Sequence, residues 1–174
     1  MAVNSLENTY PYTRHNFDAN ETYGVSPFVL ADYYFLPFKA AIKNAGARGV
    51  MCSYNAVLGV PTCLSSLIRN ARIQWGFEGY VTSDSDSIEN AYADHMYPPY
   101  DPGNPRAATG LALVDGQCDI DSGDTYNDNL VEAVRGNVEG VNMTYVDQAL
   151  YNTLKQRFDL RLFDPKVAFF LHIF

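Results

Sequence analysis

The chain has 174 residues, of which 47% are hydrophobic and 18% are charged, so it is long enough and apolar enough to bury a core. This composition excludes an intrinsically disordered protein. The formal net charge of −8 argues against a nucleic-acid partner, because phosphate binding requires clustered Lys and Arg. The sequence contains no run of apolar residues long enough to cross a bilayer, so we expect no membrane partner.

The first part of the chain predicts a loop followed by a long helix. Residues 1–25 are polar and aromatic, and they show no clear period. Ser26 and Pro27 are typical of a helix start, and the apolar spacing predicts a helix over 28–45. We expect Pro37 to kink or divide this helix, because proline removes a backbone hydrogen bond.

Beyond this helix, strand patterns alternate with helical patterns. The predicted strands are 49–54, 79–83 and 117–120. The predicted helices are 64–75, 86–95, 106–114, 127–135 and 144–162, the last with Thr144 at its N-cap position. Strands that alternate with helices indicate parallel βαβ units, and therefore an α/β fold. A TIM-type (β/α)8 barrel needs eight strands, so we expect the C-terminal part of an incomplete barrel over 1–165. The apolar tail 166–174 is interpreted as a buried strand or a sequence artefact.

Carboxylates stand where the predicted strands end. Asp84 follows the second strand directly, and the carboxyl ends of parallel strands form the face on which such folds perform chemistry. Asp84 is therefore the first candidate for a catalytic carboxylate. Asp86 and Glu89 have the spacing of a capping box, which explains Asp86 as a helix cap. Asp119 and Asp121 are interpreted as turn and cap residues.

The end of the first strand offers a second group of candidates. A carboxylate nucleophile needs hydrogen-bond donors that orient it and keep it ionised, and Tyr54 could supply one. Met51 and Tyr54 are also compatible with an ordinary place in the core.

Cysteines and sequons bear on the compartment of the protein. The chain has three cysteines, so at least one is unpaired within it; a disulfide between Cys52 and Cys63 and two buried thiols are both compatible with the sequence. Cysteine and histidine spacings typical of a metal site are absent, and the acidic run 119–124 lacks the glycine and glutamate of an EF-hand loop. The triplets that begin at Asn20 and Asn142 are sequons, which permit glycosylation in a secreted protein.

Two long motifs carry a resemblance to a known family. Residues 50–63 (VMCSYNAVLGVPTC) and 75–84 (WGFEGYVTSD) resemble glycoside hydrolase family 3, and most of all its β-xylosidase branch. Shorter matches extend the resemblance to nearly the whole chain up to Pro165. They lie at 6–8, 14–19, 34–38 and 161–165.

The resemblance implies a fold, an activity and a site. The fold is a TIM-type barrel, and the activity is hydrolysis of O-glycosidic bonds that releases xylose or a related sugar from the non-reducing end of a glycoside or oligosaccharide. The resemblance places the catalytic nucleophile on Asp84 and the binding of the terminal sugar on Met51 and Tyr54. The mechanism retains configuration, which requires a second carboxyl roughly 5–5.5 Å from the first. We expect no cofactor, and the resemblance implies a secreted protein.

The departures from the family pattern limit this expectation. The family's Lys-His pair, the first barrel strands and the C-terminal domain that carries the acid/base have no match in the 174 residues. We therefore expect no turnover by this chain alone, and we expect its partners to include the missing barrel and C-terminal segments of a full-length enzyme. One alternative is a non-catalytic carbohydrate-binding or structural remnant of the same fold. An unrelated barrel lyase or aldolase would need a lysine or a metal cluster at a strand end, and the sequence shows neither.

Overall fold

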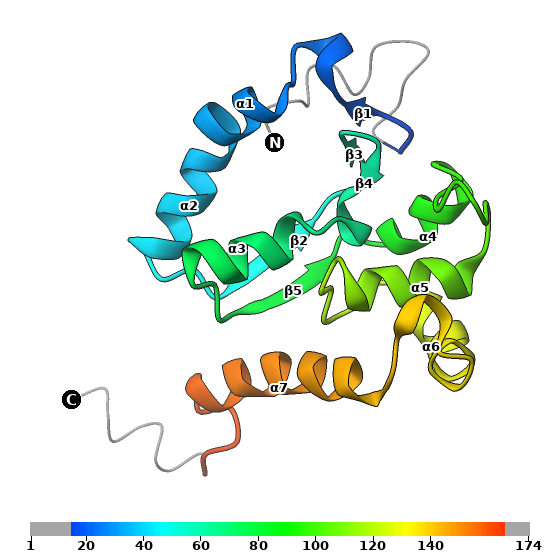
Figure 1. Ribbon diagram of the computed structural model, residues 1–174. Helices are drawn as coiled ribbons and strands as arrows, with labels where there is room; N and C mark the ends of the chain where they lie inside the picture. Colours follow the sequence, from blue (N-terminus) through cyan, green and yellow to red (C-terminus); the bar gives the residue numbers. More distant parts are fainter. Residues whose placement is uncertain (1–14, 166–174) are drawn as a thin grey trace.

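The computed structural model describes residues 15–165, which form a helix-rich α/β fold (Figure 1). The predicted apolar tail 166–174 lies outside the described residues. The strands are β1 (Asp18–Ala19), β2 (Gly49–Cys52), β3 (Ala56–Val57), β4 (Val60–Pro61) and β5 (Tyr80–Ser83). The α-helices are α1 (Pro27–Val29), α2 (Phe35–Lys43), α3 (Leu67–Trp75), α4 (Ser87–Ala93), α5 (Pro105–Val114), α6 (Thr125–Arg135) and α7 (Met143–Asp159). Single turns of 3-10 helix lie at Glu21–Tyr23, Thr62–Leu64 and Val138–Gly140, and a π-helical turn lies at Leu30–Tyr34.

The centre of the fold is the parallel pair β2–β5, whose last register pair is Cys52 with Ser83. Figure 1 shows α2 and α3 on one side of this pair and α7 along the other. From α7, Gln156 donates through its side-chain amide to the carbonyl of Glu78 at 3.3 Å. The parallel pairing and its helical cover confirm the predicted βαβ organisation.

The predicted third strand is reduced to a single bridge, between Thr82 and Ile120. The carbonyl of Val81 accepts the amides of Asp119 and Ile120 at 2.9 and 3.0 Å. Residues on both sides are engaged elsewhere, because the amide of Cys118 bonds to the end of α5 and Asp121 caps α6. The extended segment is therefore too short to form a regular strand.

The long N-terminal helix is divided one turn before Pro37. The amide of Phe35 donates to the carbonyl of Leu30, five residues back, which defines the π-helical turn. Proline has no amide hydrogen, and its ring clashes with the carbonyl four residues earlier, which here belongs to Tyr33. The widened turn accommodates the proline, so the expected interruption is confirmed but falls in the preceding turn.

Two predicted helix caps are wrong. Asp86 has a left-handed backbone with φ 57° and makes no side-chain cap bond to α4. Its amide donates to the carbonyl of Ser122 at 3.0 Å, so a contact distant in sequence and not a capping box sets its conformation. At α7, Asn142 and not Thr144 is the cap: Oδ1 of Asn142 accepts the amide of Thr144 at 2.9 Å.

The main core lies between the β2–β5 pair and the helices that follow it. Val81, Ile88 and Ala112 are fully buried in this cluster. A smaller cluster packs around Phe17 and Val25, and a third lies between α5, α6 and α7. Within residues 15–165, no helix is long and apolar enough to cross a membrane.

Candidate active site

Asp84 lies directly beyond β5, at the carboxyl end of the central pair. Its amide donates to the carbonyl of Cys52 at 3.1 Å, which extends the ladder with β2 by one residue. Its Oδ1 accepts the amide of Ser85 at 2.8 Å. The residue is half-buried, so its carboxylate is held by the backbone while it stays open to solvent. This is where the sequence placed the candidate nucleophile.

Tyr54 follows the end of the neighbouring strand and is also half-buried. Its ring stacks on that of His15, with ring centroids 4.7 Å apart and an interplanar angle of 8°. Its carbonyl lies 2.9 Å from Nε2 of His95. Because a carbonyl oxygen only accepts, Nε2 of His95 is the donor in this contact, and burial lowers the pKa of His95. Stacking and backbone bonding thus fix Tyr54 near the strand end that Asp84 follows.

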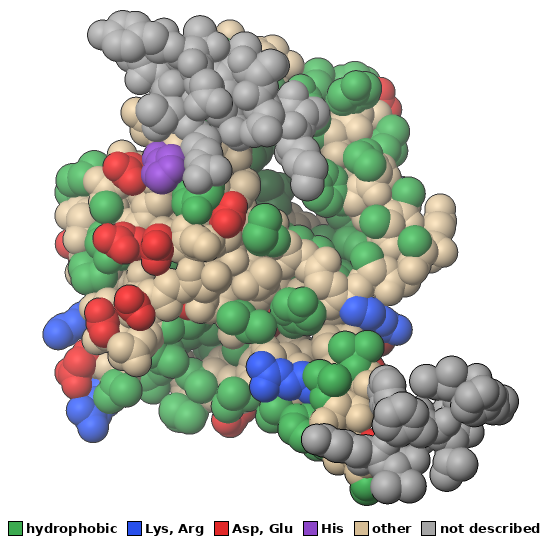
Figure 2. All heavy atoms as spheres, turned by 180° about the vertical axis from the view of Figure 1, so that it is seen from behind, with side chains coloured by type: hydrophobic (Ala, Val, Ile, Leu, Met, Phe, Trp, Pro, Cys, Tyr) green, Lys and Arg blue, Asp and Glu red, His purple; other side chains and the backbone are tan. Residues whose placement is uncertain are grey.

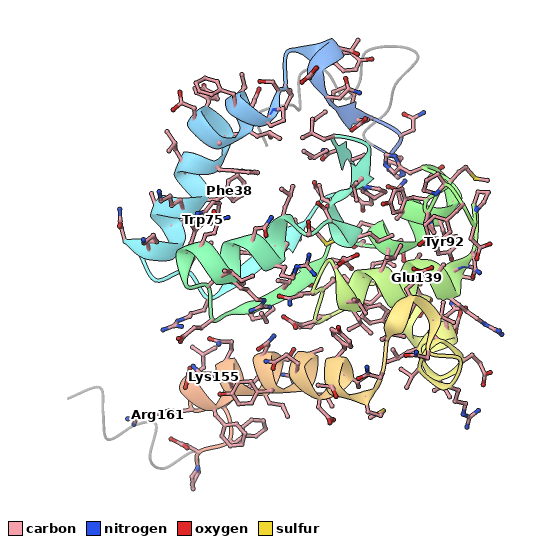
Figure 3. The ribbon with its side chains drawn as sticks, in the orientation of Figure 1. Phe38, Trp75, Tyr92, Glu139, Lys155 and Arg161 are labelled. Atoms are coloured by element: carbon pink, nitrogen blue, oxygen red, sulfur yellow. A yellow bond between two sulfur atoms is a disulfide. The ribbon has the colours of Figure 1, made fainter. Side chains whose placement is uncertain are left out.

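Met51 lies in a different environment from Asp84. It is 55% exposed on β2 and lines an apolar groove of about 910 Å³ between α2, β2 and α3. Phe38 of α2 and Trp75 of α3 both line this groove, and Figure 3 labels them. Neither Asp84 nor Tyr54 is among the described residues that line it. The structure therefore brings Asp84 and Tyr54 to adjacent strand ends, whereas Met51 lines the apolar groove.

Hydrogen bonds of Ser83 and Asp121 hold the end of β5 in place. Ser83 Oγ donates to Oδ1 of Asp121 at 3.3 Å and accepts the amide of Ser122 at 2.7 Å. Oδ2 of Asp121 accepts the amide of Tyr126 at 2.9 Å, which confirms Asp121 as a cap of α6. Burial raises the pKa of Asp121, and these hydrogen bonds oppose that shift. Ser83, the residue before Asp84, is therefore hydrogen-bonded to the loop that follows residues 117–120.

The interpretation of Asp119 as a turn or cap residue is wrong. Its side chain is 3% exposed and forms an ion pair with Arg72, whose Nη2 lies 2.9 Å from Oδ2. Asp119 also accepts the amide of Val81 at 2.7 Å and the side-chain amide of Asn152 at 2.9 Å. Burial raises the pKa of Asp119, while these partners act in the opposite direction. An acid within a predicted strand was the available signal, because a charge that a strand buries requires a partner.

Three sulfur atoms gather behind the site. Cys52 and Cys63 form a disulfide, so one of the two alternatives left by the sequence is confirmed. Cys118 is a buried free thiol, with its Sγ 3.9 Å from Sγ of Cys52, and burial raises its pKa. The disulfide joins the end of β2 to the turn Thr62–Leu64. It therefore stabilises the backbone carbonyl that positions Asp84.

Charge is unevenly distributed over the surface. Figure 2 shows acidic side chains gathered on the side of the molecule formed by α4 to α6, seen from behind. In the part of the chain that the structure describes, no group of three or more His, Cys, Asp and Glu is placed to hold a metal ion.

Comparison with protein families identifies the domain. The model of the glycosyl hydrolase family 3 N-terminal domain matches residues 19–155. The chain belongs to glycoside hydrolase family 3. This N-terminal domain has a TIM-barrel-type (β/α) fold, so the expected fold class is confirmed, and the chain is incomplete relative to its homologues.

Similar curated proteins are named as xylosidases. The chain is 36% identical over 162 residues to probable β-D-xylosidase 6 of Arabidopsis thaliana, with 91% of this chain and 19% of that protein covered. It is 35% identical over 163 residues to a probable exo-1,4-β-xylosidase of Aspergillus terreus, with 88% and 20% covered. The family 3 chain thus spans about a fifth of the length of these relatives.

Solved family 3 structures agree with this assignment. An exo-β-xylosidase in complex with a xylobiose aziridine activity-based probe superposes with a TM-score of 0.71 at 31% identity, covering 83% of this chain and 18% of that one. A β-glucosidase from Erythrobacter marinus superposes with a TM-score of 0.65 at 32% identity, covering 75% and 17%.

Proposed function

We propose that this chain supplies the nucleophile of a retaining β-glycosidase that releases xylose, or a related sugar, from the non-reducing end of β-xylosides. The nucleophile is Asp84, and Met51 and Tyr54 contribute to the binding of the terminal sugar. Family membership and the names of the relatives support glycoside hydrolysis. The observation that carries the residue assignment is the place of Asp84, half-exposed at the carboxyl end of β5.

The reaction proceeds in two displacements. In the first, the Asp84 carboxylate attacks the anomeric carbon, the bond to the leaving oxygen breaks, and a glycosyl ester forms. Water then hydrolyses the ester, with a second carboxyl acting first as the acid and then as the base. We propose that this acid/base and the missing barrel strands belong to further segments of a longer secreted protein, so that the isolated chain does not turn over substrate.

The first displacement can be tested without the acid/base. A 2-deoxy-2-fluoro-β-D-xyloside with a 2,4-dinitrophenolate leaving group needs no proton donor, because that leaving group departs as a stable anion. We expect the chain to acquire one fluoroxylosyl group, located on Asp84 by peptide mass spectrometry. The Asp84→Asn variant should stay unlabelled.

Asp86 provides the matched control. It is an exposed carboxylate two residues away, so Asp86→Asn should be labelled at the wild-type rate. Equal labelling of wild type and Asp84→Asn would contradict the nucleophile assignment. Circular dichroism should show that both variants fold like the wild type.

The alternative is a non-catalytic carbohydrate-binding remnant of the same fold. In that case xylose would bind equally to wild type and Asp84→Ala, and neither would be labelled. Steady-state release of a phenol from an aryl β-xyloside by the 174 residues would instead refute the proposed inactivity of the isolated chain.

A further inference from the structure

The two sequons adopt the same local geometry. Asn20 and Asn142 both have extended backbones, with φ/ψ of −137°/−176° and −149°/178°. Each caps a helical turn through Oδ1, which accepts the amide of the sequon threonine at 2.9 Å. The two sites therefore differ in the surroundings of the side-chain nitrogen and not in the conformation of the triplet.

The nitrogen of Asn20 is engaged by a charged partner. Its Nδ2 donates to Oδ2 of Asp18 at 2.9 Å, and Oδ1 of Asp18 accepts the amide of Gly59 at 2.9 Å. Hydrogen bonds to a carboxylate are roughly twice as strong as bonds between neutral groups. Asn20 is half-buried, and these bonds join its loop to the turn between β3 and β4.

The nitrogen of Asn142 is far less constrained. Its Nδ2 donates to the neutral carbonyl of Gly140 at 3.3 Å, a long hydrogen bond on the surface. Asn142, Met143 and Thr144 are all exposed, so the whole triplet faces solvent at the start of α7. A large group attached there would extend away from the core.

We propose that Asn142 is an acceptor of an N-linked glycan, with an oligosaccharide carried on a polyprenyl diphosphate as the donor. Nδ2 forms a bond to the anomeric carbon, the bond from that carbon to the diphosphate oxygen breaks, and Nδ2 releases one proton. The second hydrogen of Nδ2 stays available to Gly140, and Oδ1 still caps α7. The glycan is thus compatible with the folded structure.

The inference does not depend on the hydrolase proposal. It requires passage through an oxidising secretory compartment, and the Cys52–Cys63 disulfide is independent support for such a compartment.

The test is expression of the full 174 residues behind a secretion leader in a eukaryotic host. Treatment with a peptide N-glycosidase in heavy-oxygen water converts a glycosylated asparagine into labelled aspartate, which mass spectrometry then locates. We expect the label at residue 142. Two matched variants preserve the cap: Asn142→Asp keeps an oxygen acceptor and removes Nδ2, and Thr144→Ala keeps its backbone amide and removes the sequon. Both should lose the label, whereas Asn20→Gln should retain it.

Each result decides the proposal. Label at residue 142 in wild type, absent from both cap-preserving variants, supports it. An unlabelled residue 142 in wild type, or a label at residue 142 that persists in Thr144→Ala, overturns it. Chains retained inside the cell are analysed in the same way from lysates, because transfer precedes export.

Discussion

At the scale of single residues, the most consequential interaction outside the site is the ion pair between Arg72 and Asp119. Their side chains are 16% and 3% exposed, and Arg72 also donates to the carbonyl of Gly79 at 2.7 Å. Arg48 and Glu78 form a second pair at 3.4 Å, with side chains 53% and 69% exposed. The two pairs should contribute differently to stability because of their burial: water screens the exposed pair, whereas loss of one partner in the buried pair leaves a costly unpaired charge.

We predict that Arg72→Met lowers the free energy of unfolding by about 3–5 kcal/mol, since it leaves the buried carboxylate of Asp119 without its cation. Arg48→Met, which disrupts the exposed pair, should cost less than about 1 kcal/mol. Urea unfolding at neutral pH measures both. The double variant Arg72→Met/Asp119→Asn should recover part of the loss. Equal effects of the two single variants would show that the buried pair contributes no more than the exposed one.

The sequence was a good guide to which candidate residues lie next to strand ends. The positions of Asp84 and Tyr54 follow from short apolar runs that end abruptly, which is local information. The pairing of Arg72 with Asp119 was not predictable in this way, because 47 residues separate the two and the contact depends on how α3 packs against the strands. Likewise, the conformation of Asp86 depends on Ser122, which no local pattern identifies.

At the scale of elements, helix starts vary in how much their caps contribute. Oδ1 of Asn104 accepts the amides of Arg106 and Ala107 at 2.9 and 3.3 Å, at the start of the buried helix α5. At α4 the expected capping box of Asp86 and Glu89 is absent, and Asp86 makes no cap bond. Sequence spacing alone could not separate these two cases, because both have suitable residues at the helix start.

We predict that Asn104→Ala lowers the free energy of unfolding by about 1 kcal/mol, because it leaves two amides of the first turn of α5 without their acceptor. Glu89→Ala should change it by less than about 0.5 kcal/mol, since Glu89 is exposed and belongs to no capping box. Thermal unfolding followed by circular dichroism compares the two. A loss of about 1 kcal/mol in Glu89→Ala would contradict this prediction and indicate that Glu89 does form a capping box.

The third strand shows how tertiary structure limits an element that local pattern favours. The predicted segment 117–120 is short and ends in acids, as strand ends often do, and it does run parallel to β5 at Ile120. The amide of Cys118 donates to a carbonyl near the end of α5, and Asp121 accepts an amide in the first turn of α6. Because α5 and α6 engage the residues on either side, only the bridge between Thr82 and Ile120 forms here. The length of this strand therefore depends on contacts outside the segment.

At the scale of the whole molecule, an apolar groove lies between α2, β2 and α3, where a closed barrel would be filled. Among residues 15–165, β2 pairs with β5 alone, and apolar side chains of α2 and α3 face the groove. The family 3 relatives are about five times as long as the region that matches them, since the chain covers 19–20% of their length. Large exposed apolar surfaces are uncommon on monomeric soluble proteins, and they bind apolar molecules.

We predict that the chain enhances the fluorescence of an anilinonaphthalene sulfonate dye through this groove. Phe38 lines the groove and is 46% exposed, so Phe38→Ser should reduce the enhancement severalfold. Phe28 is 73% exposed and lies outside the lining, so Phe28→Ser removes a comparable ring without changing the signal. Because partly unfolded proteins also bind such dyes, near-ultraviolet circular dichroism must show fixed aromatic packing in all three proteins. Equal fluorescence from the two variants would show that the dye binds elsewhere and would contradict the prediction.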